Sequence, residues 1–230
     1  MKMSPKGALA KPFLVDEVLF PAGSQVTSYS FVDACGKKSA CQVQLLLLRG
    51  VNVNGRGRFG WTGLMAAIVW ENAEMVTLLL SRDDIDINMT DSEGRSALHH
   101  AAWYRRIEIL ATLLADPRLN TVNPLDESGA TPLLVAVDNC SIECIQLLLK
   151  DPRTDPNLKF EFSRCKCERC SSHKDSNPNR PGVSLTYGGS PLMWAVKRGL
   201  KECVKILLPD PRVNLMTTDS YTRSKGELIR

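Results

Sequence analysis

Nine residues, Cys165 to His173, gather more metal-binding side chains than any other stretch of this 230-residue chain. They read Cys-Lys-Cys-Glu-Arg-Cys-Ser-Ser-His and include three of the eight cysteines and one of the three histidines. Three thiolates and one imidazole satisfy a tetrahedral Zn²⁺ ion. Because a polar loop buries too little apolar surface to order itself, the metal would be what folds it. We therefore predict one structural zinc ion bound by Cys165, Cys167, Cys170 and His173.

The spacing of these ligands leaves other interpretations open. Nine residues make a compact site, and Cys-x-Cys is less common around a single zinc ion than Cys-x₂-Cys, so one ligand could come from elsewhere or from a second molecule. The same residues are also compatible with a polar loop whose cysteines are incidental, with a redox-sensing pair of thiols, or with an S-acylated patch beside basic residues.

Two adjacent histidines, His99 and His100, are the other candidates for acid–base chemistry. No serine, aspartate or cysteine lies at a spacing that indicates a catalytic triad with either of them. We therefore expect a protein that is not an enzyme, without catalytic residues and without a cofactor other than the zinc ion.

The histidines lie in a stretch, Gly94 to Leu114, that predicts two short helices. A turn ends at Gly94, Ser96 caps a helix that continues to about Tyr104, and a second helix runs through Leu114. Isolated helices shorter than about 12–15 residues are marginally stable in water, so neighbouring elements must cover the apolar faces of these two.

The cover is supplied by repetition of the same unit. The lead glycines Gly60, Gly94, Gly129 and Gly188 are 34, 35 and 59 residues apart, and Thr131-Pro132-Leu133 and Ser190-Pro191-Leu192 repeat the start of the first helix. A period of about 33 residues with a Thr-Pro-Leu-His-x-Ala core is typical of ankyrin repeats. From about Ala34 to Arg223 the chain therefore resembles the ankyrin-repeat family. The resemblance implies an all-α solenoid of helix–turn–helix repeats with β-turn or hairpin fingers, in which His99 braces the turn.

The separation of 59 residues between Gly129 and Gly188, against 34 and 35 for the other lead glycines, indicates about 25 inserted residues in an otherwise regular array. The predicted organisation is a flexible arm (1–27), an ankyrin-repeat domain (28–223) with a cap repeat (28–54) and repeats one to four (55–88, 89–123, 124–157 and 185–216), a Cys-rich insertion (158–184), and a tail that begins a further repeat (217–230). The incomplete last unit is also compatible with a fragment or short isoform of a longer array.

The resemblance further implies a partner-binding surface on the turn tips and the exposed side of the first helices. The residues at these positions that we select as the site are Arg58, Phe59, Trp61, Trp70, Arg95, Trp103, Tyr104, Tyr187, Lys197 and Arg198. Exposed tryptophan, tyrosine and arginine dominate the energetics of protein interfaces. For Trp70 and Trp103, packing between adjacent first helices is an equally open alternative.

Composition narrows the function classes. The net charge of +4 does not indicate nucleic-acid binding, and the longest uncharged apolar run, residues 63–70, is far shorter than the ~20 residues of a membrane helix. No signal-peptide core is present near the N-terminus, so we expect an intracellular protein of the cytoplasm or nucleus, and a monomer. The predicted function is a non-catalytic scaffold or adaptor that binds a partner protein. The alternative is a zinc-stabilised regulatory module whose Cys165–His173 insert recognises nucleic acid or a regulatory partner.

Overall fold

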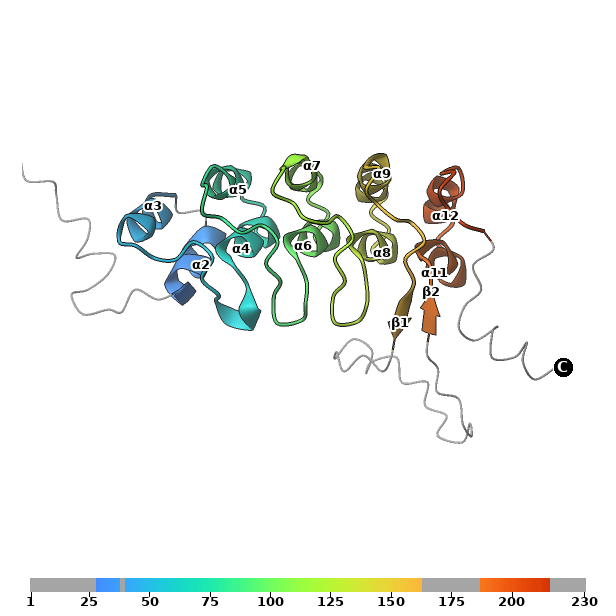
Figure 1. Ribbon diagram of the computed structural model, residues 1–230, viewed down its shortest axis with the longest axis horizontal. Helices are drawn as coiled ribbons and strands as arrows, with labels where there is room; N and C mark the ends of the chain where they lie inside the picture. Colours follow the sequence, from blue (N-terminus) through green and yellow to red (C-terminus); the bar gives the residue numbers. More distant parts are fainter. Residues whose placement is uncertain (1–27, 38–39, 163–186, 216–230) are drawn as a thin grey trace, which may run out of the picture.

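The computed structural model of the chain describes residues 28–37, 40–162 and 187–215. Within these residues, ten α-helices form pairs that stack side by side in one elongated array (Figure 1). The first helices of the pairs are α2 (Ser28–Gly36), α4 (Gly63–Val69), α6 (Ala97–Trp103), α8 (Pro132–Asp138) and α11 (Pro191–Lys197). The second helices are α3 (Ala40–Leu48), α5 (Ala73–Leu80), α7 (Ile107–Ala115), α9 (Ile142–Lys150) and α12 (Lys201–Leu207). This architecture confirms the predicted all-α repeat solenoid.

Each first helix after α2 begins at a hydroxyl-bearing residue. The side chains of Thr62, Thr131 and Ser190 accept a hydrogen bond from the backbone N–H three residues further on. Ser96 does the same in α6 as half of a capping box that His99 completes. Such caps satisfy N–H groups that have no partner within the helix, which is why helices of seven residues can begin sharply here.

The core runs along the array as a series of equivalent contacts. Alanines on the first helices, Ala67, Ala101, Ala136 and Ala195, are fully buried and let neighbouring first helices approach closely. Leucines on the second helices are equally buried: Leu79, Leu113, Leu148 and Leu207. Because each repeat packs mainly on its neighbours, stability is a sum over adjacent units, with no single central core.

The turns that precede the first helices, called fingers here, extend from one edge of the array (Figure 1). The finger of repeat one contains a short 3₁₀ helix, η1 (Arg58–Gly60), and that of repeat two closes with a bridge between Thr90 and Ser96. Before repeat four, β1 (Phe160–Phe162) and β2 (Tyr187–Gly189) pair antiparallel, with Phe162 opposite Tyr187. Strand β1 therefore lies inside the segment predicted as the insertion, and the two strands place Phe162 and Tyr187, which flank residues 163–186, opposite each other.

Asparagines link the loops between repeats. The Nδ2 groups of Asn54, Asn88 and Asn123 donate to backbone carbonyls 30 residues ahead, at distances of 2.7–2.9 Å. Asn157 makes the same bond, at 2.7 Å, to the carbonyl of Arg212, which lies 55 residues ahead. The bonding pattern of the array thus continues across the insertion.

Candidate partner-binding surface

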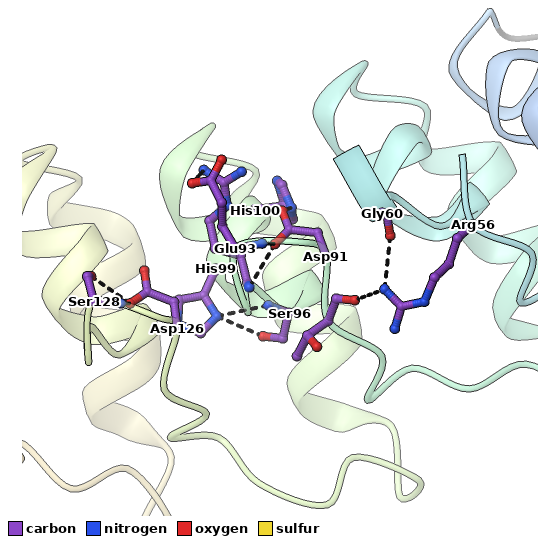
Figure 2. Close-up of polar contacts among 11 residues, drawn as sticks. Arg56, Gly60, Asp91, Glu93, Ser96, His99, His100, Asp126 and Ser128 are labelled. Carbon is purple, nitrogen blue, oxygen red and sulfur yellow. Dashed lines mark hydrogen bonds and ion pairs between the residues drawn. The ribbon is translucent and has the colours of Figure 1, made fainter. Parts of the chain in front are cut away.

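The finger of repeat two is built around a buried carboxylate, Asp91. Its Oδ1 accepts the backbone N–H groups of Glu93 and Arg95, both at 2.9 Å, and its Oδ2 accepts Arg95 Nε and His100 Nε2, both at 3.0 Å (Figure 2). Burial alone would raise the pKa of Asp91, but the bonds from His100, from these two N–H groups and the Arg95 charge outweigh it and hold this pKa well below its ordinary value. Asp126 organises the next finger in the same way, through the N–H groups of Ser128 and Ala130.

His99 connects this finger to the following one. Its Nδ1 accepts the Ser96 N–H at 3.1 Å, so Nε2 carries the hydrogen and donates to the Ala130 carbonyl at 3.0 Å. Burial lowers the pKa of His99 and keeps the ring neutral. The histidine therefore braces the fingers through hydrogen bonds, as the resemblance implies, and both of its nitrogens are occupied in doing so.

Repeat one departs from this design, because Gly57 stands where the other two fingers have an aspartate. Gly60 has a positive φ of 71°, as do the equivalent glycines Gly94 and Gly129, but in this finger the preceding residue, Phe59, also has a positive φ, of 57°. Positive φ is a strained conformation for a bulky side chain. The turn is held by the Ser92 N–H, which donates to the Phe59 carbonyl at 2.9 Å, and by Arg56, which donates to the carbonyls of Gly60 and Thr90 (Figure 2). As a result the Phe59 side chain is 70% exposed at the tip.

Four rings form a continuous series from this tip to the end of α6, and we call them the aromatic ladder: Phe59, Trp61, His100 and Tyr104. The ring centroids of Phe59 and Trp61 are 6.4 Å apart, and the Trp61 and His100 rings meet edge to face at 5.3 Å. The His100 and Tyr104 rings are stacked with centroids 6.4 Å apart. The ladder joins repeats one and two. Its member His100 was not predicted to belong to the site.

The remaining predicted residues occupy different environments. Trp70 is 63% exposed at the end of α4, with Cδ1 only 2.7 Å from where a Cβ at Gly36 would lie, so it projects beside α2. Trp103 is half-buried against the core, which favours packing at that position. Arg58 is exposed and Arg95 is half-buried on the Asp91 carboxylate. Tyr187 opens β2, but its side chain lies outside the described part.

Lys197 and Arg198 lie at the end of α11, two repeats beyond the ladder. Both are exposed, and the Arg198 guanidinium lies 5.6 Å from the centre of the Trp194 ring and 3.7 Å from an oxygen of Asp138. The structure thus brings the aromatic residues of repeats one and two together and leaves the basic pair as a separate group. Trp194 was missed because it occupies the repeat position of His100, which the sequence did not mark as exposed.

The predicted zinc ligands Cys165, Cys167, Cys170 and His173 lie outside the described residues. Within residues 28–37, 40–162 and 187–215, no three His, Cys, Asp or Glu side chains gather closely enough to bind a metal ion. In the same part of the chain, none of the helices combines the length and apolar character needed to cross a bilayer.

Comparison with known proteins gives consistent matches. Residues 31–123 match the family described as Ankyrin repeats (3 copies), and residues 128–159 and 187–219 match Ankyrin repeat. Human Rabankyrin-5 is 30% identical over 181 residues, which cover 78% of this chain and 13% of that protein. The probable E3 ubiquitin-protein ligase XBOS32 of Oryza sativa subsp. japonica is 34% identical over 46% of this chain and 27% of its own length. The ankyrin repeat protein nuc-2 of Neurospora crassa is 33% identical over 40% of this chain and 9% of its own length.

The chain therefore spans less than a third of each of these relatives. The family matches nevertheless cover well over half of its 230 residues, in register with the helix pairs of the structure. The chain belongs to the ankyrin-repeat family.

Proposed function

We propose that the chain is a non-catalytic scaffold or adaptor module that binds a partner protein on the surface formed by its fingers and first helices. Ankyrin repeats generally mediate protein–protein interaction. The observation that carries the proposal is the aromatic ladder, which ends in a phenylalanine that is 70% exposed although its backbone is strained. Strained residues persist where surrounding structure fixes them, and they cluster at binding sites.

The chemistry of the neighbouring side chains supports a protein partner. Aromatic rings provide large contact area at a low cost in conformational entropy, and arginines at the rim add hydrogen bonds. The two buried histidines support a non-catalytic role, because both nitrogens of His99 and the Nε2 of His100 already take part in the hydrogen bonds of the fingers. We place the module inside the cell as a monomer, in keeping with the composition.

The test compares partner capture by the parent and by two variants of equal design. Phe59→Ala with Trp70→Ala removes the two most exposed rings of the proposed surface. The control, Leu48→Ala with Ile107→Ala, removes exposed apolar side chains from the second helices α3 and α7. Proteins captured from a lysate by the parent are quantified by mass spectrometry and then retested in purified form.

The proposal expects the affinity for a purified partner to fall at least about tenfold in the Phe59/Trp70 variant and to stay unchanged in the control. Circular dichroism should show equal helix content in all three proteins, since the substituted side chains are exposed. Equal affinity of parent and Phe59/Trp70 variant for every confirmed partner would contradict the use of this surface.

We propose as a second function that the Cys165–His173 segment binds zinc and contacts nucleic acid or a regulatory partner. Its support is the ligand motif, together with strands β1 and β2, which pair Phe162 with Tyr187, the residues that flank 163–186. The segment from Lys159 to Arg180 contains six basic and three acidic residues, which gives it a weak net positive charge.

Elemental analysis of protein purified under reducing conditions tests this proposal. We expect about one zinc ion per chain in the parent and none in a Cys165→Ser, Cys167→Ser, Cys170→Ser variant. A salt-dependent gel shift that is lost in the same variant would favour nucleic acid as the ligand. Parent protein without zinc would contradict the site.

A further inference from the structure

Two apolar positions of the repeat are buried in repeats one to three but not in repeat four. One position, on the first helix, is occupied by Ile68, Ala102, Val137 and Val196, and the other, on the second helix, by Val76, Leu110, Ile145 and Val204. In repeats one to three, all six side chains are at most 1% exposed. In repeat four, Val196 is 61% exposed and Val204 is only half-buried. The difference indicates that the following repeat covers these positions.

Helices supply this cover throughout the array. Helix α6 packs on α4, α8 on α6 and α11 on α8, while α9 packs on α7 and α12 on α9. Repeat four is the last repeat that the structure describes, and its helices α11 and α12 lie at the end of the array (Figure 1). Terminal repeats ordinarily have a polar outer face. Repeat four instead keeps the apolar side chains that are covered elsewhere in the array.

Four apolar side chains of repeat four make up what we call the end face: Met193, Val196, Val204 and Leu208. Leu208 is 49% exposed, and Met193 is half-buried although its equivalents in repeats one to three are all buried. Val204 and Leu208 are four residues apart and therefore lie on one side of α12. Because α12 packs against α11, the end face extends over both helices. Exposed apolar side chains that gather in this way mark sites of protein interaction.

The charged residues beside the end face are mostly basic. From Pro191 to Leu208 the chain has one acidic residue, Glu202, and four basic residues: Lys197, Arg198, Lys201 and Lys205. All four are exposed, and none of their positions holds a basic residue in repeats one to three. The acidic charge is already engaged, because Glu202 forms an ion pair with Lys205 at 2.7 Å. The positive charge is thus particular to repeat four.

We propose that the end face binds an amphipathic α-helix of another protein, with large apolar side chains along one side and acidic side chains beside them. The end face would continue the array's own mode of contact, since the equivalent faces of repeats one to three are covered by helices. This surface consists of α11 and α12 alone and is separate from the aromatic ladder of repeats one and two. The proposal therefore does not depend on partner binding at the fingers.

The positions of the basic residues select an acidic helix over other occupants. Lys201, Val204 and Leu208 are three and four residues apart, so a lysine directly adjoins the apolar side chains on α12. Opposite charges beside an apolar contact guide a partner to it and fix its register. A second copy of the same end face would instead bring like charges together, which disfavours self-association through this surface.

The experiment titrates the full chain against two fluorescein-labelled synthetic helical peptides and measures fluorescence anisotropy. Both peptides carry leucines at helical spacing on one side; one has glutamates at the flanking positions and the other has lysines there. We expect the acidic peptide to bind at least about tenfold more tightly than the basic one, and this preference to shrink at high salt. Lys201→Glu should weaken binding of the acidic peptide and strengthen binding of the basic one.

Val196→Ser with Leu208→Ser should lower the affinity for the acidic peptide at least about tenfold. The matched control, Leu48→Ser with Ile107→Ser, alters exposed apolar side chains of α3 and α7 and should leave it unchanged. Circular dichroism checks that these exposed substitutions preserve the helix content.

Three results would overturn the proposal. The first is equal affinity of the two peptides, or of the parent and the Val196/Leu208 variant. The second is a dimer in sedimentation that this variant abolishes, which would assign the end face to a second copy of the chain. The third is binding that requires removal of residues 216–230, which would assign it to the chain's own tail.

Discussion

A single neutral imidazole, that of His99, links two adjacent fingers, so its protonation state matters for the stability of the whole surface. Protonation of Nδ1 would remove the acceptor for the Ser96 N–H and place a charge among buried groups. Since burial lowers the pKa of His99, the unfolded chain binds a proton at a higher pH than the folded protein does. Asp91 also has a lowered pKa, and its buried carboxylate must stay ionised to accept its four hydrogen bonds.

The pH dependence of unfolding follows from the lowered pKa values of His99 and Asp91. The contribution of His99 is fully present above the ordinary pKa of histidine, 6.5, and declines as the pH falls below it. The contribution of Asp91 is present above the ordinary value of 3.8 and is lost as the pH falls further. We expect the free energy of unfolding, measured in urea at a series of pH values, to decrease first below about pH 6.5 and again below about pH 4.

His99→Gln provides the control for the upper step. This variant should lose about 2 kcal/mol at pH 7, because buried backbone groups of two fingers lose their partner. Its stability should then change less than that of the parent between pH 7 and pH 5. Parallel curves for parent and variant over this range would show that another group causes the decline.

A second test at the residue scale asks whether the left-handed backbone conformation of a non-glycine residue, Glu71, destabilises the protein. Glu71→Gly and Glu71→Ala both remove the ion pair to Arg106, but only glycine relieves the φ of 56°. We expect the glycine variant to be more stable than the alanine variant by about 1 kcal/mol in chemical denaturation. An alanine variant as stable as the glycine variant would mean that this turn stores no strain.

Sequence reasoning at this scale succeeded where the repeat alone determines the environment. His99 matched a family position, and its predicted role in bracing the turn is the one observed. The aromatic ladder could not be predicted, because it depends on how one repeat is placed against the next. The positive φ of Phe59 was missed, since the repeat pattern alone does not give backbone angles.

At the scale of elements, an Asp-Pro-Arg motif caps the helices of the preceding repeat. Arg118 donates to the carbonyls of Leu80 and Arg82 at the end of α5, both at 2.7 Å, and Arg153 donates to Leu114 in α7 at 2.8 Å. Arg212 does the same for the carbonyl of Leu149 in α9. The guanidinium groups lower the pKa of the partner aspartates Asp116, Asp151 and Asp210 through hydrogen bonds. Each arginine thus satisfies helix carbonyls that lack an intrahelical partner.

The Asp-Pro-Arg sequence recurs at residues 116–118, 151–153 and 210–212, but its capping role was not predicted. The helix pairs themselves were predicted. The helix expected from Ser96 to about Tyr104 is observed as Ala97–Trp103. The contacts of Arg118 and Arg153 span 36 to 39 residues and that of Arg212 with Leu149 spans 63, so they appear only once the repeats are stacked.

Replacing arginine by lysine tests the capping role. Lysine keeps the charge but cannot bind an aspartate with two parallel bonds and reach two carbonyls at once. Arg118→Lys should therefore lower the free energy of unfolding by about 1–2 kcal/mol. Arg153→Lys should cost less than about 1 kcal/mol, because Arg153 is more exposed and reaches one carbonyl. No loss in either variant would indicate that only the charge contributes.

At the scale of the whole molecule, repeats three and four contact each other as the other repeats do, although the insertion separates them in the sequence. Asn157 bonds to the carbonyl of Arg212 at 2.7 Å and accepts the Asn214 N–H at 2.6 Å. Trp194 Nε1 donates to Asp138 at 2.9 Å, again between repeats three and four. The step of 59 residues between lead glycines predicted where the insertion enters, since insertions in repeat proteins map to loops. The pairing of β1 with β2 was not predicted, because three-residue strands carry little periodic signal.

The contacts between described residues of repeats three and four lead to a deletion experiment. Residues 163–186 are replaced by Asn-Gly, a pair suited to a two-residue turn between antiparallel strands that end opposite each other at Phe162 and Tyr187. Because the contacts between repeats three and four lie elsewhere, we expect one cooperative urea transition, detected equally by tryptophan fluorescence and circular dichroism. The shorter loop should leave stability unchanged or raise it by about 1–2 kcal/mol. A chelator should have no effect on the shortened chain, while any zinc-dependent stability of the parent would be lost in chelator. If fluorescence instead reports an early, separate loss of repeat four, then residues 163–186 contribute to holding that repeat on the array, and the insertion is part of the fold.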